Sequence, residues 1–196
     1  GTRQRVLIIF GIAFMSTFTL LTVLSVTKWF ADPGLGPIVL FGLSIGVAFG
    51  VTHLSTGISN KVALRSSLIM ALLALILYYP NQWFFGVEQK KIVYSLMIIA
   101  LFVISGTVPL LLTKIDRGPV IRTSILSAFI MGLLTVVDKL MQTWKPYMET
   151  DAVYFRPVPT IGQVNALLEP GNFWMNFLDI LVHLFLPTTA LLLISF

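Results

Sequence analysis

The feature that most constrains this sequence is a series of six long apolar runs separated by short polar segments. The hydrocarbon core of a bilayer is about 30 Å thick and takes roughly 20 helical residues to cross. Hydrophobic residues make up 57% of the 196-residue chain and charged residues only 11%, whereas soluble domains carry about 25% charged residues. The pattern therefore predicts an all-α fold, a polytopic transmembrane helix bundle of about six spanning helices.

The limits of these runs predict where the helices begin and end. The first run is too long for the roughly 7 to 15 apolar residues of a signal peptide, so we expect it to span. The third run should stop at Pro80, within a cluster of interfacial aromatic residues. A polar, proline-rich stretch, 142–172, predicts an extramembrane loop before the last helix. The expected helices cover residues 6–26, 38–58, 62–79, 92–113, 120–141 and 173–196.

The distribution of basic residues predicts the orientation in the membrane. The formal net charge is +5, but the basic residues lie at the ends of apolar runs, as topology signals do, which excludes a nucleic-acid-binding surface. With a cytoplasmic N-terminus, the inner segments hold one acid, Asp116, and the loop 142–172 faces outward. We expect a multi-pass protein of the cell membrane, inner or plasma, in this orientation. The inner basic residues are then Arg3, Arg5, Lys61, Arg65, Lys114, Arg117 and Arg122.

Two polar residues of the last run are candidate site residues. Asp179 and His183 are four residues apart, so they share one helix face and could hydrogen-bond each other. Polar groups inside a span are costly, which favours a functional role such as proton relay or substrate orientation. The simpler interpretation, which we favour, places them at the outer end of the helix among headgroups and water. By the same reasoning we expect Asp138 and Lys139 to be interfacial, and His53 to be a packed, satisfied histidine.

A stripe of glycines marks the second run. Gly42, Gly46 and Gly50 recur at four-residue spacing, so one helix face lacks side chains and permits close helix packing. Glycine tolerated in a lipid-facing helix is an equally good interpretation, because glycine is common in spanning helices.

No pattern in the chain predicts catalysis. There is no Cys, and the glycines are not followed by the Lys-Ser or Lys-Thr pair of a phosphate-binding loop. The two histidines, His53 and His183, are far apart in the sequence. We expect no catalytic residue, metal site or cofactor, and hence no enzyme; any ATP chemistry belongs to another chain.

The stretch 157–196 contains PVPTIGQ, then PGNFW from Pro170, then FLDILVHLFLPTTAL from Phe177. It resembles the permease subunits of the oligopeptide, dipeptide and nickel family of ABC importers. In that family an outer loop with a Pro-x-x-Gly element leads into a His-Leu-x-Leu-Pro segment, which opens a spanning helix before the cytoplasmic coupling loop. That coupling loop and the family's usual N-terminal segment are not found here.

The resemblance implies a permease segment of an ABC importer for peptides or related small solutes, working by alternating access and driven by a separate ATPase. Its partners would be the lipid bilayer, a second permease subunit, ATPase subunits and an extracytoplasmic solute-binding protein, with no nucleic acid. Asp179, His183 and Pro187 would line the substrate pathway. Residues 1–141 would form an accessory five-helix membrane segment, 142–172 the outer loop, and 173–196 the start of the permease core of a longer subunit.

A different class of function is the alternative hypothesis. The chain could be a small polytopic membrane scaffold or assembly protein that binds other membrane subunits through the glycine face of residues 42–50.

Overall fold

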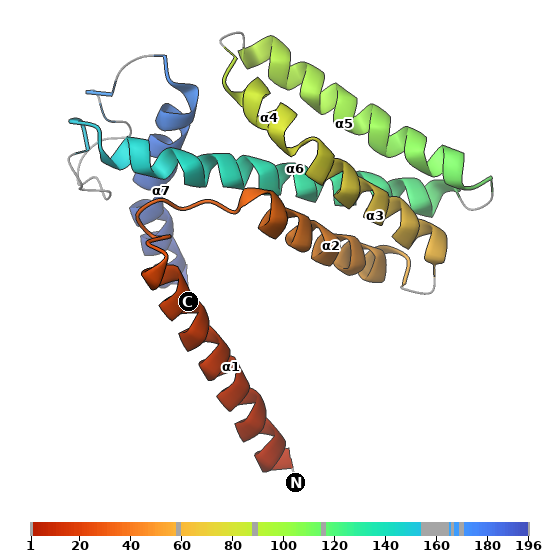
Figure 1. Ribbon diagram of the computed structural model, residues 1–196, viewed down its shortest axis with the longest axis horizontal. Helices are drawn as coiled ribbons and strands as arrows, with labels where there is room; N and C mark the ends of the chain where they lie inside the picture. The colour runs from red at the N-terminus through yellow and green to blue at the C-terminus, as the bar shows by residue number, and fades with distance from the viewer. Residues whose placement is uncertain are drawn as a thin grey trace. The chain divides into compact units, whose positions relative to one another are not determined.

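The computed structural model describes residues 2–57, 60–87, 90–114, 117–153, 165, 167–168 and 171–195. Within these residues the chain forms seven helices and no strand, which confirms the all-α prediction (Figure 1). Four helices are long and apolar enough to cross a membrane, and a bent pair adds a fifth if it counts as one span, close to the expected six. The chain is thus a multi-pass membrane protein. It divides into two compact units, residues 35–140 and residues 1–34 with 141–196.

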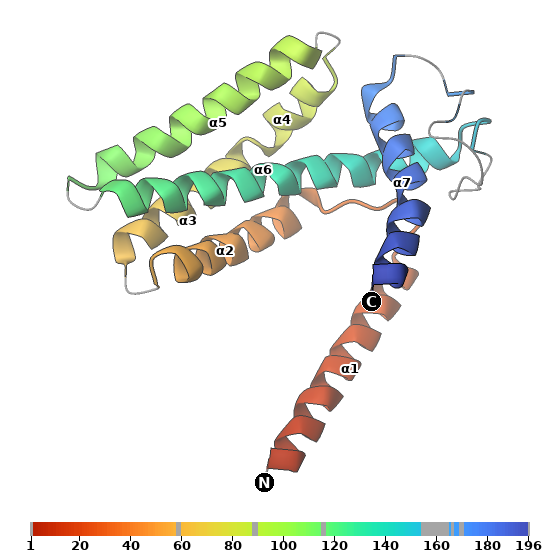
Figure 2. The ribbon, with the colours of Figure 1, turned by 180° about the vertical axis from the view of Figure 1, so that it is seen from behind.

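The first unit, residues 35–140, is a bundle of antiparallel helices (Figures 1 and 2). At the start of α2, Gly36 adopts a left-handed φ of +69°, which glycine tolerates, and a proline follows in the first turn. Asn60 caps α3, because its side chain accepts a hydrogen bond from the Ala63 amide. The helices of this unit are α2 (Gly36–Ser55), α3 (Lys61–Ile76), α4 (Tyr78–Phe85), α5 (Lys90–Leu112) and the first part of α6 (Arg117–Met148).

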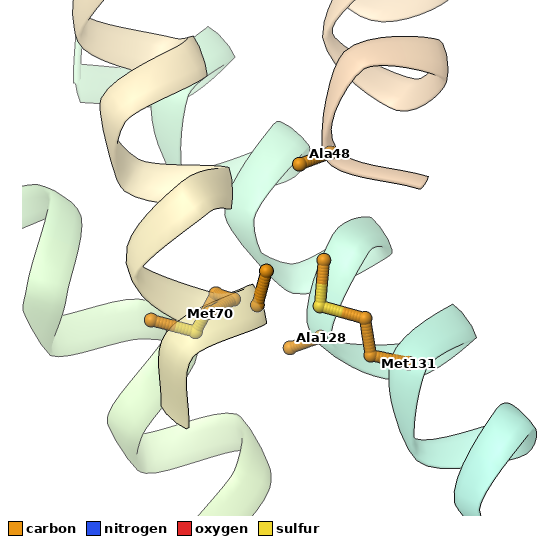
Figure 3. Close-up of a cluster of buried hydrophobic side chains, with 5 residues drawn as sticks. Ala48, Met70, Ala128 and Met131 are labelled. Atoms are coloured by element: carbon orange, nitrogen blue, oxygen red, sulfur yellow. The ribbon is translucent and has the colours of Figure 1, made fainter. Parts of the chain in front are cut away.

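The apolar core of this unit joins three helices. Ala48 of α2, Met70 and Ala71 of α3, and Ala128 and Met131 of α6 are all buried there. Figure 3 shows the Met70 side chain from α3 and the Met131 side chain from α6 directed into the space between the helices. The small alanine side chains let the helix backbones approach closely, which favours packing in a membrane.

The third expected helix does not stop where predicted. After Ile76 the chain bends by 55° and resumes as α4, so the prediction of a helix stop at Pro80 is wrong. Pro80 lies in the first turn of α4, where a backbone N–H has no intrahelical acceptor and its loss costs little. The proline that argued for a stop is therefore compatible with a new helix start.

The helix α6 is also longer than predicted. It continues from Arg117 to Met148, so residues 142–148 are helical rather than part of the expected loop. Pro146 removes one helix hydrogen bond, but the next residue, Tyr147, is only 2% exposed and is held by a tertiary contact described below. Much of the remaining loop, 154–164, 166 and 169–170, lies outside the described residues.

The second unit contains α1 (Thr2–Val26), the end of α6 and α7 (Phe173–Ser195), close to the first and last helices expected from the sequence. Between α1 and residue 34, the Trp29 indole donates a 2.8 Å hydrogen bond to the Gly34 carbonyl. Lys145 and Asp32 form a 3.5 Å ion pair, but both side chains are largely exposed, so it contributes little. The buried side chains of this unit, among the described residues, come from the end of α6, the following turn and the start of α7: Thr143, Tyr147, Val153, Trp174, Leu178 and Asp179.

Candidate functional site

The centre of the candidate site is the carboxylate of Asp179, in the second turn of α7. Its side chain is 0% exposed. One oxygen accepts a 2.8 Å hydrogen bond from the Tyr147 hydroxyl at the end of α6, and the other accepts a 2.8 Å bond from the Asn165 backbone amide. The Asn165 side chain in turn donates to the carbonyl of Ala152 at 2.8 Å. One carboxylate thus joins two helices and the segment between them.

His183 lies one turn further along α7, and the structure brings it onto Asp179 as the four-residue spacing predicts. Its Nδ1 lies 2.8 Å from the Asp179 backbone carbonyl and 3.4 Å from the Asp179 carboxylate. Both groups accept hydrogen bonds, so Nδ1 is the nitrogen that donates to them. The interpretation that Asp179 meets headgroups and water is wrong, because its side chain is fully buried.

Pro187 lies one further turn along the same face, inside α7, and is exposed. It has no N–H, so it cannot give the carbonyl of His183 the hydrogen bond that residue i+4 supplies in a regular helix. Asp179, His183 and Pro187 therefore form a row along one face of α7, in which the His183 carbonyl lacks the hydrogen bond that a regular residue 187 would donate. Such a row can orient a ligand that carries N–H donors.

A second buried carboxylate, Asp138 of α6, lies in the unit of residues 35–140. It is 0% exposed. One oxygen accepts hydrogen bonds from the backbone amides of Leu35 and Gly36, at 2.6 and 3.3 Å. The other accepts from the Tyr78 hydroxyl at 3.0 Å and from the side-chain amide of Gln82 at 3.2 Å. Four donors satisfy the carboxylate, which caps α2 and holds the start of α4.

Asp138 therefore binds protein donors rather than headgroups and water, and its position near the membrane interface stays a prediction. A sequence signal existed, because Asp138 continues the helical spacing of Ser124, Ser127, Met131 and Thr135, all of which are buried on the same face of α6. A carboxylate on the buried stripe of a spanning helix needs partners inside the bundle.

Hydroxyl groups join α2, α3 and α6 at the other end of the same unit. The Ser67 hydroxyl accepts from Ser127 at 2.9 Å and from Thr52 at 3.5 Å, and Ser55 hydrogen-bonds Thr123. Short polar side chains that bond across helices are typical of packing in membranes. Thr123, Ser124 and Ser127 of α6 are all 0% exposed.

The glycine stripe of α2 has no packing partner within the described residues. Gly42, Gly46 and Gly50 are exposed, and a Cβ atom built on any of them would meet nothing within 4 Å. His53 is also exposed, so the prediction of a packed histidine is wrong.

In the part of the chain that the structure describes, no group of three or more His, Asp or Glu side chains could hold a metal ion. Comparisons with models of known protein families, with curated proteins and with solved structures found no match. The resemblance over residues 157–196 therefore stands on the sequence alone.

Proposed function

We propose that the chain is a membrane-spanning permease segment of an ABC importer for peptides or related small solutes. It works by alternating access, driven by a separate ATPase, with a second permease subunit and an extracytoplasmic solute-binding protein as further partners. The sequence of residues 157–196 supports this proposal through its Pro-x-x-Gly and His-Leu-x-Leu-Pro elements. The orientation that goes with it places the N-terminus in the cytoplasm and the end of α6 outside.

The observation that carries the proposal is the buried Asp179 carboxylate. It ties the end of α6 and Asn165 to the start of α7 through two 2.8 Å hydrogen bonds. Asn165 is thus held against the start of α7, which suits a surface that must receive a binding protein. Further along, the His183 carbonyl, which Pro187 leaves without its regular helix partner, suits the N–H groups of a peptide, since peptides present amide and ammonium donors.

The test is peptide uptake in cells that carry the complete importer as their only route for a radiolabelled peptide. We expect His183→Ala, which removes the imidazole from Asp179, and Pro187→Ala, which restores a donor to the His183 carbonyl, each to lower uptake roughly tenfold, the size expected for one lost hydrogen bond. Thr189→Ala is the matched control on α7, because within the described part of the chain the Thr189 hydroxyl bonds to its own helix, at the Phe185 carbonyl. Uptake equal to the control in both variants, or purification of the subunit without any ATPase, would overturn the proposal.

A second candidate, a scaffold for other membrane subunits, is favoured by the open glycine face of α2. Because a Cβ at Gly46 would meet none of the described residues within 4 Å, that face can receive another helix. Gly46→Leu should then break the complex while uptake persists, and Leu96→Phe, which enlarges an exposed side chain of α5 rather than α2, should not. Loss of uptake with an intact complex would count against the scaffold.

A further inference from the structure

Five basic side chains lie at one end of the unit of residues 35–140. Lys61 and Arg65 belong to the first turns of α3, Lys114 follows α5, and Arg117 and Arg122 belong to the first turns of α6. All five are exposed. We call this group the basic end.

The packing of the helices brings these residues to the same end. The hydrogen bonds from Ser127 to Ser67 and between Ser55 and Thr123 hold the first turns of α6 beside those of α3 and the last turn of α2. Figures 1 and 2 agree that α2 and α5 finish where α3 and α6 begin. Charges that are up to 61 positions apart in sequence, from Lys61 to Arg122, therefore meet in one surface.

No ion pair involves the basic end within the described residues, where the recorded pairs are Lys145 with Asp32 and His183 with Asp179. The positive charge there is uncompensated by those residues. Clustered Lys and Arg side chains beside a spanning helix attract anionic headgroups, and the planar guanidinium of Arg suits two phosphate oxygens at once.

Exposed leucines lie beside these charges. Leu54 in the last turn of α2 and Leu111 in the last turn of α5 are each 87% exposed. A soluble partner would leave such side chains partly in water, which is unfavourable. A phospholipid covers both features, because its phosphate lies next to its acyl chains.

We propose that the basic end binds the headgroups of anionic phospholipids in preference to zwitterionic ones. The proposal concerns a surface outside the Asp179 site and does not rest on the transport function.

The test measures which lipids surround the basic end. The chain has no Cys, so Leu111→Cys offers a single position for a fluorophore. The full chain is reconstituted into phosphatidylcholine vesicles that contain an equal mole fraction of either brominated phosphatidylglycerol or brominated phosphatidylcholine, whose bromine atoms quench a nearby fluorophore. We expect roughly threefold or greater enrichment of the anionic lipid at the label, decreasing as salt is raised.

A matched pair of variants separates local binding from net charge. Arg65→Gln with Arg122→Gln removes two charges from the basic end and should bring the enrichment close to one. Lys90→Gln with Lys91→Gln removes two charges from the first residues of α5, at the opposite end of that helix, and should leave it unchanged.

Three results would overturn the proposal: equal quenching by both lipids, as expected if the surface serves a protein partner; an equal fall in both double variants; or full enrichment in the Arg variant. The salt series uses the protein that carries only the Leu111→Cys label and no charge substitution. It therefore tests the proposal even if one of the charge variants misfolds.

Discussion

At the scale of single residues, two buried carboxylates organise the protein, and each is satisfied by groups distant in sequence. Asp138 accepts four hydrogen bonds from α2, α4 and the residue before α2. Asp179 accepts from Tyr147 and Asn165, and His183 lies against it. Removing a buried acceptor costs more than its hydrogen bonds contribute, because the donors left behind remain desolvated.

The first residue-scale prediction concerns Asp138. Asp138→Leu leaves the amides of Leu35 and Gly36 and the Tyr78 and Gln82 side chains without this acceptor, so we expect a loss of about 3 kcal/mol or more in unfolding free energy. Val137→Leu, at a 44% exposed neighbouring position, should change it by less than about 0.5 kcal/mol. Denaturant unfolding in detergent micelles measures both. Equal stability of the two variants would show that the four hydrogen bonds are not formed.

The second concerns the contact that holds α6 to α7. Tyr147→Phe removes one hydroxyl donor from the Asp179 carboxylate, and we expect a loss of about 1.5 to 3 kcal/mol, the range for a hydrogen bond to a charged group. A double-mutant cycle with Asp179→Asn isolates the pair, because additive single effects would mean that the two side chains do not interact.

At the scale of elements, the helices follow from local sequence, but their bends and ends do not. The bend of 55° between α3 and α4 occurs beside the contacts of Tyr78 and Gln82 with Asp138. The continuation of α6 past Pro146 ends at Tyr147, which is bonded to Asp179. At Pro146 the tertiary contact outweighs the local preference of a proline, whereas Pro80 lies in the first turn of α4, where a proline is tolerated.

The element-scale prediction tests the hydroxyl contacts among α2, α3 and α6. Ser67→Ala removes the acceptor shared by Ser127 and Thr52, and we expect a loss of roughly 0.6 to 1.7 kcal/mol, as found for hydrogen bonds between spanning helices. Ser95→Ala is the control, because that exposed hydroxyl bonds only to the Lys91 carbonyl of its own helix. If both variants unfold alike, the contacts between helices add nothing to stability.

At the scale of the whole molecule, the orientation can be measured directly, since a chain without Cys gives no background in thiol labelling. With a cytoplasmic N-terminus, a membrane-impermeant maleimide added to intact cells should label Lys91→Cys and Glu149→Cys, while Lys114→Cys should react only after permeabilisation. All three positions are exposed in the structure. The reverse pattern would mean that the positive-inside prediction is wrong.

By itself the sequence determined that this protein is all-helical and embedded in a membrane, and where most helices lie. The reason is physical: a backbone in hydrocarbon must satisfy its hydrogen bonds within its own helix, so an apolar run of sufficient length dictates the structure locally. It also placed Asp179 and His183 on one face, because helical spacing is local too.

Only the tertiary structure decided which polar groups are buried and what they bind. Asp138 and Asp179 are both close to expected helix ends in the sequence, yet both are fully buried. Their donors come from residues up to 103 positions away, and such pairings depend on how the helices pack rather than on any local pattern. The open glycine face of α2 and the meeting of five basic residues at one end of a unit were decided in the same way, by which surfaces the packing covers and which it leaves exposed.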